Sequence, residues 1–330
     1  MAAQKVEECH MPRKNTLWVD DATLSKDVSG KTYIVTGANS GVGLETTRQL
    51  IKQGGHVVMA CRRVEAGEEV ARDFTGLKGS YEVIGCDLAD LASVRSFAES
   101  FRAKHTLLHG LMCNAGAVIM GSEAKYSKDG FEMTMAASFW GHFLLTELLL
   151  EPLKAAAPSR VGILSSVVHA NSPAKRYAVN FDDIDWKTRK YSAFDAYGEA
   201  KVANVLYGVE LADRLNGTGV TTASIHPGWA RSNFGRGSGF LMDTLFTVLR
   251  PLTHFMSDSN WASAQTSLHV LLSDDAPNHN GTYFSQSSVL YRDKECRDGG
   301  WPMASPNPNA TDLEAARKLV DLAREKVGLS

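Results

Sequence analysis

Short apolar runs alternate with segments of helical periodicity along most of this chain. The runs have the length of buried strands, and the segments between them repeat apolar residues at the three-and-four spacing of amphipathic helices. The expected strands cover residues 32–35, 55–60, 80–86, 108–113, 160–164, 220–225 and 281–284. The expected helices cover residues 44–51, 64–74, 92–105, 130–150, 194–215 and 262–272, with Pro152 ending the fourth. Regular alternation of this kind predicts an α/β fold with a parallel sheet of about seven strands and helices on both faces.

No linker rich in Gly, Ser or Pro interrupts this pattern, and no repeat is found, so one domain is expected. Residues 1–29 are polar and aperiodic and are interpreted as an N-terminal leader. Residues 30–285 form the expected catalytic and nucleotide-binding domain, and residues 286–330 a C-terminal extension.

Composition narrows the class of protein. The chain has 330 residues, 44% of them hydrophobic and 22% charged, with a net charge of −2, which disfavours nucleic acid as a partner. Its five cysteines include no C-x-x-C pair, so they are expected to be reduced core thiols, and no metal site is predicted. The first residues lack a signal-peptide core, and no apolar stretch is long enough to span a bilayer. A cytoplasmic protein is the simplest interpretation.

A glycine-rich turn joins the first expected strand to the first expected helix. Its glycines have the spacing G-x-x-x-G-x-G, at Gly37, Gly41 and Gly43. Gly37 permits the tight turn, Gly41 permits close approach of a pyrophosphate, and Gly43 permits close packing of helix on strand. The helix N-terminus then presents free N–H groups to phosphates. The candidate phosphate-binding residues are Gly37, Asn39, Ser40, Gly41, Val42 and Gly43; alone, the motif also fits an ordinary tight loop.

Other polar or special residues also stand where expected strands end. In a doubly wound sheet, ligands bind beyond the carboxyl ends of the strands, at the point where the strand order reverses. The residues at these ends are Gly37, Arg62, Asp87, Asn114, Ser166 and Pro227. Their coincidence predicts a Rossmann-type nucleotide site.

The residues after the second strand indicate which nucleotide is bound. NAD-binding folds usually place an acidic side chain there for the ribose hydroxyls, whereas this chain has Arg62 and Arg63. Two guanidinium groups suit a 2′-phosphate, so NADP is predicted over NAD, with a solvated basic pair as the alternative. Asp87 can accept a hydrogen bond from adenine or cap the helix that begins near Asp90.

Tyr197 and Lys201 are candidates for acid–base chemistry. A spacing of four places both side chains on one face of the helix expected at residues 194–215. The phenol has an ordinary pKa of about 10, which a neighbouring ammonium together with an oxidised nicotinamide is expected to lower. Ser166 at the end of the fifth strand can hold the substrate oxygen. Taken alone, such a pair also fits an amphipathic helix surface.

In this order the motifs resemble those of the short-chain dehydrogenase/reductase family. They are Thr36-Gly37-x-x-x-Gly41-x-Gly43, Asp87-Leu88, Asn114-Ala115-Gly116, Ser165-Ser166, Tyr197-x-x-x-Lys201 and Pro227-Gly228. The retinol dehydrogenase-like branch is the most similar, through stretches such as Ala60-Cys-Arg62, Gly141-His-Phe-Leu-Leu-Thr146 and His226-Pro-Gly228.

This resemblance implies roles for individual residues. Tyr197 would be the acid/base, Lys201 would bind the nicotinamide ribose and tune Tyr197, and Ser166 would polarise the carbonyl. The implied cofactor contacts also include Leu88, Asn114, Ala115, Gly116, Pro227, Gly228, Trp229 and Ser232. The implied activity is NADP(H)-dependent interconversion of a hydrophobic alcohol and its aldehyde or ketone, in a monomer or homodimer.

The chain departs from the family pattern at Ser138. The family has an asparagine in the corresponding Asn-x-x-Gly-His-Phe pattern, where it organises a water that relays protons to the lysine. Ser138 is shorter, which leaves open a weakened enzyme that serves as an NADP-binding sensor or scaffold.

Light-dependent protochlorophyllide reductases show a second resemblance. They share the Met-Ala-Cys-Arg strand end, a Cys-Asn-Ala stretch like residues 113–115 and a tail like residues 315–329. Trp229 stands where those enzymes have a cysteine, and their long insertion before the tyrosine is mostly absent, so this double-bond reductase activity is the weaker alternative.

The substrate side is expected in residues 229–258, which are rich in Phe, Leu, Met and Trp. A hinge at residues 237–239 would let this segment close over an apolar, lipid-like carbonyl. A core-packing helix and a patch that dips into a membrane surface are the alternatives. His169, three residues after Ser166, is a candidate substrate contact.

Overall fold

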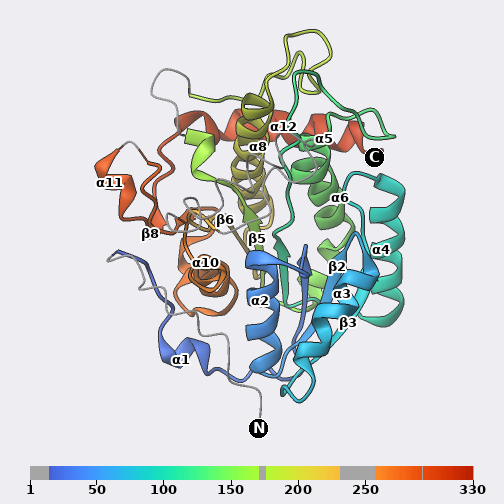
Figure 1. Cartoon of the computed structure of the whole chain (residues 1–330), viewed down its shortest axis with the longest axis vertical. Helices are drawn as coiled ribbons and strands as arrows, with labels where there is room; N and C mark the ends of the chain where they lie inside the picture. The colour runs from blue at the N-terminus through green and yellow to red at the C-terminus, as the bar shows by residue number, and fades with distance from the viewer. Residues whose placement is uncertain (1–14, 171–175, 231–256, 292, 330) are drawn as a thin grey trace, which may run out of the picture.

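The described residues form one twisted sheet covered by helices on both faces (Figure 1). The computed structural model describes residues 15–170, 176–230, 257–291 and 293–329. The sheet has the strand order β3-β2-β1-β4-β5-β6-β7-β8, in which β8 alone is antiparallel to its neighbour. The strands are β1 (Thr32–Thr36), β2 (His56–Cys61), β3 (Ser80–Gly85), β4 (Gly110–Cys113), β5 (Ser159–Leu164), β6 (Val220–His226), β7 (Tyr283–Ser285) and β8 (Gly300–Met303).

The order reverses between β1 and β4, which is the switch point of a doubly wound sheet. All seven strands expected from the apolar runs are present, and the expected Rossmann-type fold is confirmed. β8 was not expected, because Pro302 and flanking glycines obscure its pattern. As an edge strand it tolerates a proline.

Two layers of helices enclose the sheet. One face carries α1 (Asp21–Leu24), α2 (Gly41–Lys52), α3 (Val64–Ala71) and α10 (Asn260–Leu272). The other carries α4 (Leu91–Lys104), α6 (Gly141–Leu148), α8 (Ala193–Arg214) and α12 (Leu313–Lys326). Short helices complete the described chain: η1 (Arg72–Phe74), α5 (Met133–Met135), η2 (Ala136–Trp140), α7 (Leu150–Ala155), η3 (Val167–Ala170), η4 (Ala276–His279), α11 (Lys294–Arg297) and η5 (Pro308–Ala310).

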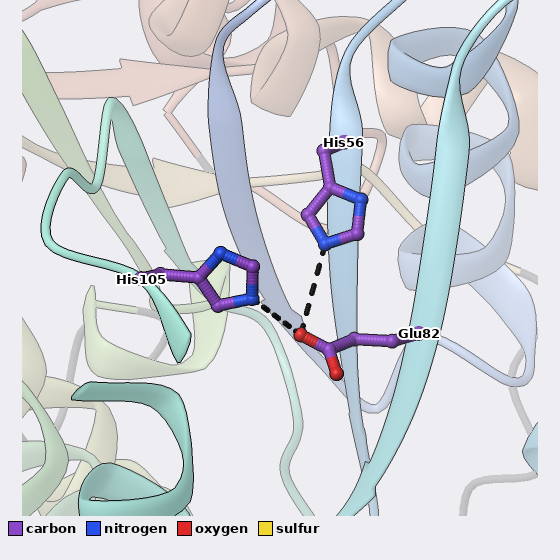
Figure 2. A group of neighbouring side chains, drawn as sticks. All are labelled: His56, Glu82 and His105. Carbon is purple, nitrogen blue, oxygen red and sulfur yellow. Dashed lines mark hydrogen bonds and ion pairs between the residues drawn. The ribbon is translucent and has the colours of Figure 1, made fainter. Parts of the chain in front are cut away.

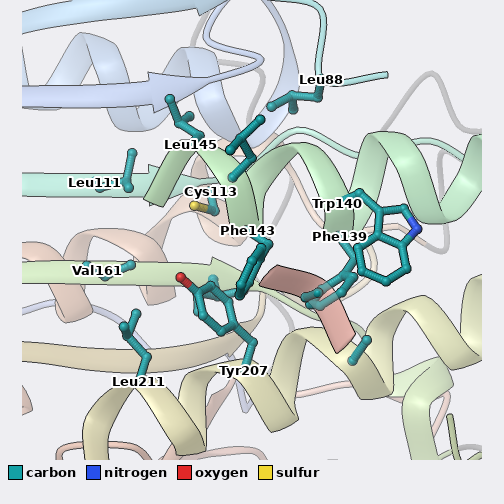
Figure 3. Close-up of a cluster of buried hydrophobic side chains, with 14 of the residues drawn as sticks. Leu88, Leu111, Cys113, Phe139, Trp140, Phe143, Leu145, Val161, Tyr207 and Leu211 are labelled. Atoms are coloured by element: carbon teal, nitrogen blue, oxygen red, sulfur yellow. The ribbon is translucent and has the colours of Figure 1, made fainter. Parts of the chain in front are cut away.

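The larger hydrophobic core lies between the sheet and helices α6 and α8 (Figure 3). The rings of Phe139, Phe143 and Tyr207 are fully buried there, with centroids 5.9 Å apart for the two phenylalanines and 5.0 Å for Phe143 and Tyr207. Dense packing of large rings against the strands holds α8, the helix of Tyr197 and Lys201, rigidly over the sheet.

The helix expected over residues 130–150 differs in detail. Gly130 lies in a turn with φ +83°, and Glu132 caps the helix that begins at Met133 by accepting the Met135 N–H. One turn of π-helix, η2, precedes α6. Pro152 lies inside the first turn of α7 rather than ending a helix, because a proline in a first turn gives up no intrahelical hydrogen bond.

Both ends of the described chain pack on the domain. The backbone of Leu17 is bonded to Gln286, and α12 packs on α8 through a stripe that includes Leu319 and Ala323. The division into leader, domain and extension stays a prediction.

Candidate active site

The glycine turn connects β1 to α2 at the carboxyl edge of the sheet. Gly37 and Gly41 have φ angles of +64° and +58°, a region that L side chains rarely adopt. A Cβ on Gly43 would lie 2.5 Å from the Gly37 carbonyl oxygen, so only glycine lets the helix approach the strand this closely. A Cβ on Gly41 would meet no atom within 4 Å, and the N-cap residue Ser40 makes no side-chain capping bond. The N-terminus of α2 is therefore open toward the space where a phosphate fits.

Thr36 ties this turn to β4 and to the helix beyond it. Its hydroxyl oxygen accepts the N–H groups of Asn114 and Ala115, each at 2.9 Å. The side-chain amide of Asn114 donates to the Thr36 carbonyl at 2.8 Å. His142 Nδ1 faces the Ser138 carbonyl at 3.2 Å and Nε2 faces the Thr36 hydroxyl at 2.8 Å. A carbonyl only accepts, so Nδ1 carries the proton and Nε2 accepts from Thr36.

This network assigns Asn114 a positioning role and reveals a residue that the sequence analysis did not single out. Asn114 and Ala115 are partly buried and hold the turn through these hydrogen bonds. In the sequence Thr36 stands out only as part of the glycine motif, because a threonine at a strand end carries no signal of its own. Burial lowers the pKa of His142 to about 4, which keeps its ring neutral and suited to this network.

Arg62 and Arg63 follow β2 and are both exposed. Within the described part of the chain, neither guanidinium has an ion-pair partner, so both remain available to an anionic ligand. The Asp87 carboxylate accepts the Ala89 N–H at 3.0 Å, and Leu88 is buried beside it. Asp90, not Asp87, caps α4 by accepting the N–H groups of Ala92 and Ser93. Asp87 is thus not the helix cap considered from the sequence.

The candidate catalytic side chains meet where β5 and α8 lie together. Tyr197 is 8% exposed and Lys201 is 2% exposed, so the interpretation as a surface pair is wrong. The Tyr197 hydroxyl is hydrogen-bonded to Ser166. Lys201 Nζ lies 5.4 Å from the centre of the Tyr197 ring and donates to the Leu164 carbonyl at 2.8 Å.

The two serines after β5 have different partners. Ser165 is buried, and its hydroxyl donates to the Lys201 backbone carbonyl at 2.8 Å, which anchors α8 to the strand. Ser166 is partly exposed and bonded to Tyr197. Only Ser166 is therefore placed to contact a substrate.

Burial sets the protonation of this group. It raises the pKa of Tyr197 to about 12, although the hydrogen bond from Ser166 opposes part of that shift. It lowers the pKa of Lys201 to about 7. Burial therefore outweighs the Ser166 hydrogen bond, and the phenol is protonated at neutral pH. The lower pKa expected with Lys201 and an oxidised nicotinamide beside Tyr197 stays a prediction.

Ser138 lies in the π-helical turn η2, and its hydroxyl faces the same small space as the lysine. A Cβ on Gly116 would lie 3.5 Å from both Ser138 Oγ and Lys201 Nζ. Ser138 Oγ is buried and has no hydrogen-bond partner among the described residues. Buried hydroxyls are rarely left unbonded, so this one has room and need for a further partner beside Lys201.

Pro227, Gly228 and Trp229 follow β6 at the same edge of the sheet. Gly228 has a φ of +85°, and a Cβ there would lie 2.9 Å from Asp258 Oδ2. The Trp229 N–H donates to the same carboxylate oxygen at 3.1 Å, and the Asp258 N–H donates to the Trp229 carbonyl at 2.7 Å. Asp258, which sequence reasoning missed, closes this loop. Ser232 and most of the segment 229–258 lie outside the described residues.

His169 does not reach the substrate side. Its ring is fully buried, with Nδ1 donating to the Ser166 carbonyl at 2.6 Å and Nε2 bonded to Ser305 Oγ at 2.8 Å. Asn307 donates to the His169 carbonyl at 2.6 Å. The expectation of a substrate contact is wrong, because the C-terminal segment takes up this ring and thereby supports the Ser166 loop from behind.

The described cysteines are buried free thiols, as expected: Cys61, Cys86, Cys113 and Cys296. Burial raises the pKa of Cys61 to about 11 and that of Cys113 to about 12. Within the described ranges, no helix is both long and apolar enough to cross a bilayer.

Comparison with known proteins places this site in a family. The model of the short chain dehydrogenase family matches residues 31–178. Human retinol dehydrogenase 13 is 38% identical over 305 residues, which are 92% of this chain and 86% of the relative. Mouse retinol dehydrogenase 12 is 41% identical over 280 residues, 84% of each chain.

Solved structures agree with the fold. An uncharacterized protein from Mycobacterium paratuberculosis superimposes with a TM-score of 0.71 at 29% identity, covering 92% of this chain and 96% of that one. RhlG of Pseudomonas aeruginosa, solved with NADP, superimposes with a TM-score of 0.60 at 20% identity and covers 78% of this chain and 95% of that one. At this identity the similarity supports the fold alone. With the glycine turn, the Ser–Tyr–Lys group and these relatives in agreement, this chain belongs to the short-chain dehydrogenase/reductase family, in its retinol dehydrogenase-like branch.

Proposed function

We propose that this protein is an NADP(H)-dependent oxidoreductase that interconverts a hydrophobic alcohol and its aldehyde or ketone. The observation that carries the proposal is the group formed by partly exposed Ser166 with buried Tyr197 and Lys201, which shares the carboxyl edge of the sheet with the glycine turn. The similarity to retinol dehydrogenases supports a retinoid-, steroid- or lipid-like substrate.

The residues at the sheet edge suit this cofactor. The open N-terminus of α2 offers N–H groups to a diphosphate, and Arg62 with Arg63 offers cationic donors to a 2′-phosphate. Asp87 and Leu88 would flank the adenine, while Gly116, Pro227, Gly228 and Ser232 would border the nicotinamide. When bound, NADPH would supply the hydride.

The protein's own groups would handle the substrate oxygen. The Ser166 hydroxyl donates a hydrogen bond to the carbonyl oxygen, which draws electron density away from the carbonyl carbon. The Tyr197 hydroxyl gives its proton to that oxygen as the carbon accepts hydride, so the product is the neutral alcohol. Lys201, one turn along α8, would bind the nicotinamide ribose and return a proton to Tyr197.

Turnover by the purified protein is the direct test. We expect NADPH to be consumed with at least one long-chain or polyene aldehyde from a panel that also contains short, polar aldehydes and steroid ketones. Tight NADPH binding without oxidation by any member of the panel would instead favour the alternative function, an NADP-binding sensor or scaffold. The double-bond reductase activity is disfavoured, because Trp229 stands where those enzymes have a cysteine.

Replacement of Arg62 by alanine tests the cofactor preference. Loss of a charge-assisted bond to the 2′-phosphate should weaken NADPH binding by roughly 10- to 100-fold and NADH binding by less than about twofold. Fluorescence titration of both nucleotides measures the two constants. Arg72→Ala, which removes an exposed arginine on η1, is the matched control. Equal losses for the two nucleotides in Arg62→Ala would contradict the phosphate assignment.

Ser138 is tested through the partner that its buried hydroxyl lacks. If it holds a water that relays protons to Lys201, Ser138→Ala should lower kcat by about tenfold without raising the melting temperature. If the hydroxyl is simply unbonded, the alanine variant should be more stable by about 1 kcal/mol and equally active. A large gain of activity in Ser138→Asn would show that the natural chain is catalytically weakened, which supports the sensor alternative.

Other features of the proposal rest on the sequence. A cytoplasmic location, a monomer or homodimer, and a lid in residues 229–258 with weak contact to a membrane surface all stay predictions.

A further inference from the structure

Two histidines and a glutamate meet at the edge of the sheet opposite the nucleotide side (Figure 2). His56 is the first residue of β2, Glu82 lies on β3, and His105 ends α4. The two strands are parallel. His56 pairs with Ser80, and Glu82, two residues further along β3, pairs with Val58. Because alternate residues of a strand share a face, His56, Ser80 and Glu82 all point to the face that α4 covers.

The three donor atoms converge on one point. His105 Nε2 lies 2.5 Å and His56 Nε2 lies 3.7 Å from the same oxygen, Glu82 Oε1. All three atoms lie within 4.8 Å of one another. Ligands of a tetrahedral Zn²⁺ stand about 3.3 Å apart, given metal–ligand distances of about 2.0–2.1 Å. Small side-chain rotations would bring the trio to that spacing.

Neighbouring groups orient the donors toward this point. His56 Nδ1 is bonded to Ser80 Oγ at 2.8 Å, which leaves its Nε2 facing Glu82. The His105 ring packs between the rings of His56 and Phe101, with centroids 5.1 and 5.0 Å away. Metal-binding histidines typically have the ring nitrogen that does not bind the metal held by a hydrogen bond, as Nδ1 of His56 is here.

The second histidine, His56, reaches a carboxylate that two other groups already contact, with its Nε2 at an ion-pair distance of 3.7 Å from Oε1. Glu82 already receives Lys104 Nζ on Oε2 at 2.6 Å and His105 on Oε1. His56 Nε2 is shielded from solvent and has no hydrogen-bond partner among the described residues. A cation bound to both histidines and to Oε1 would bring all three donor atoms into direct coordination. Lys104 can keep Oε2 while that cation takes Oε1.

We propose that His56, Glu82 and His105 bind Zn²⁺, with water completing the coordination. Two imidazole nitrogens and one carboxylate oxygen suit Zn²⁺, whereas Mg²⁺ and Ca²⁺ select oxygen ligands. The ion would join β2, β3 and the end of α4, far from the Ser166–Tyr197–Lys201 group, so its role is structural. The sequence predicted no metal site because these ligands come from three separate elements and show no recognisable spacing.

Calorimetric titration with ZnCl₂ of protein first treated with a chelator and dialysed tests the site. We expect one equivalent to bind, and Glu82→Gln and His105→Ala each to weaken the binding at least about tenfold. His279→Ala is the matched control, since His279 is another partly exposed histidine paired with a carboxylate, that of Asp275. Binding that is unchanged in Glu82→Gln and His105→Ala, or equally lost in His279→Ala, would overturn the proposal.

Two further measurements separate loss of the site from loss of the fold. Added Zn²⁺ should raise the melting temperature of the wild type and of His279→Ala by a few degrees but not that of His56→Gln, whose circular dichroism in chelator should match the wild type. Co²⁺ bound in place of Zn²⁺ should give the absorption spectrum of a cobalt ion with nitrogen and oxygen ligands. Thiolate charge-transfer bands would place the metal on cysteines and refute the assignment. None of these readouts depends on oxidoreductase activity.

Discussion

Replacement of Tyr197 by phenylalanine is expected to lower kcat for carbonyl reduction by roughly 10²- to 10⁴-fold while NADPH binding persists. The change removes only the hydroxyl that is bonded to Ser166 and keeps the buried ring. That loss corresponds to the usual contribution of a positioned general acid. Steady-state rates with a reducible aldehyde, together with a fluorescence titration of NADPH, measure both quantities.

Tyr177→Phe is the matched control for this variant. The Tyr177 hydroxyl donates to Asp195 at 3.0 Å, and the Tyr177 ring packs against Gly198. Asp195 and Gly198 lie on α8, the helix that also carries Tyr197. It should therefore retain kcat within about twofold, since it removes a phenol close to the site but outside the proposed chemistry. Wild-type turnover in Tyr197→Phe would exclude Tyr197 as the acid.

The dependence of rate on pH should differ between the two directions of the reaction. Because burial raises the pKa of Tyr197 to about 12, the phenol is the protonated acid at neutral pH. Its protonation then favours carbonyl reduction and causes no loss of that rate until pH approaches the pKa. Alcohol oxidation needs the phenolate, so its rate should rise with pH over the same range. A fall in the oxidation rate as pH rises from neutral would contradict this assignment.

Lys201→Met should abolish activity and yet stabilise the folded chain. Lys201 is 2% exposed, and burial lowers its pKa from 10.5 to about 7. That displacement corresponds to an upper limit of about 5 kcal/mol for keeping the charged amine inside the protein. Loss of the Nζ bond to the Leu164 carbonyl offsets part of the gain. We therefore expect the free energy of unfolding to rise by about 2–4 kcal/mol at pH 7.

The direction in which stability changes with pH follows from which state, folded or unfolded, keeps the proton on Lys201. Between pH 7 and 10.5 the unfolded chain holds a proton on Lys201 that the folded chain has released, so wild-type stability rises with pH in this window. Below pH 7 Lys201 is protonated in both the folded and the unfolded chain, so the full cost of burying its charge remains. Urea unfolding at pH 7 and at pH 10 should show this slope in the wild type and a smaller one in Lys201→Met.

Lys154→Met provides the control, because Lys154 is an exposed lysine paired with Glu151. Its unfolding free energy should stay within about 0.5 kcal/mol of the wild type. Destabilisation of Lys201→Met at pH 7 would mean that the amine is better solvated than its burial implies.

Local patterns were sufficient for most of the fold and for the identity of the candidate residues. Apolar runs of strand length predicted β1 to β7, and the three glycines predicted the turn into α2, because each signal is contained in a few adjacent residues. The break in the expected helix at residues 130–150 was harder to predict. The π-helical turn that holds Ser138 includes the buried rings of Phe139 and Trp140, and Phe139 contacts Tyr207, which lies far along the chain.

The protonation of the site depended on contacts across the chain. The Tyr197–Lys201 spacing indicated that the two side chains share a helix face, but not that this face is buried against β5. Burial raises the pKa of Tyr197, an effect that the spacing of the two residues does not reveal. His169 likewise looked like a substrate contact until Ser305 and Asn307, far along the chain, were found to hold it.

The sequence by itself predicted the doubly wound sheet, the glycine turn and the candidate Ser–Tyr–Lys group, because hydrophobic periodicity and motif spacing are properties of neighbouring residues. Tertiary structure alone decided which polar atoms are buried, such as the Ser138 hydroxyl, which has no hydrogen-bond partner among the described residues. It also brought His56, Glu82 and His105 together from three elements. Burial and convergence depend on what packs against a residue from distant parts of the chain, and no local pattern contains that information.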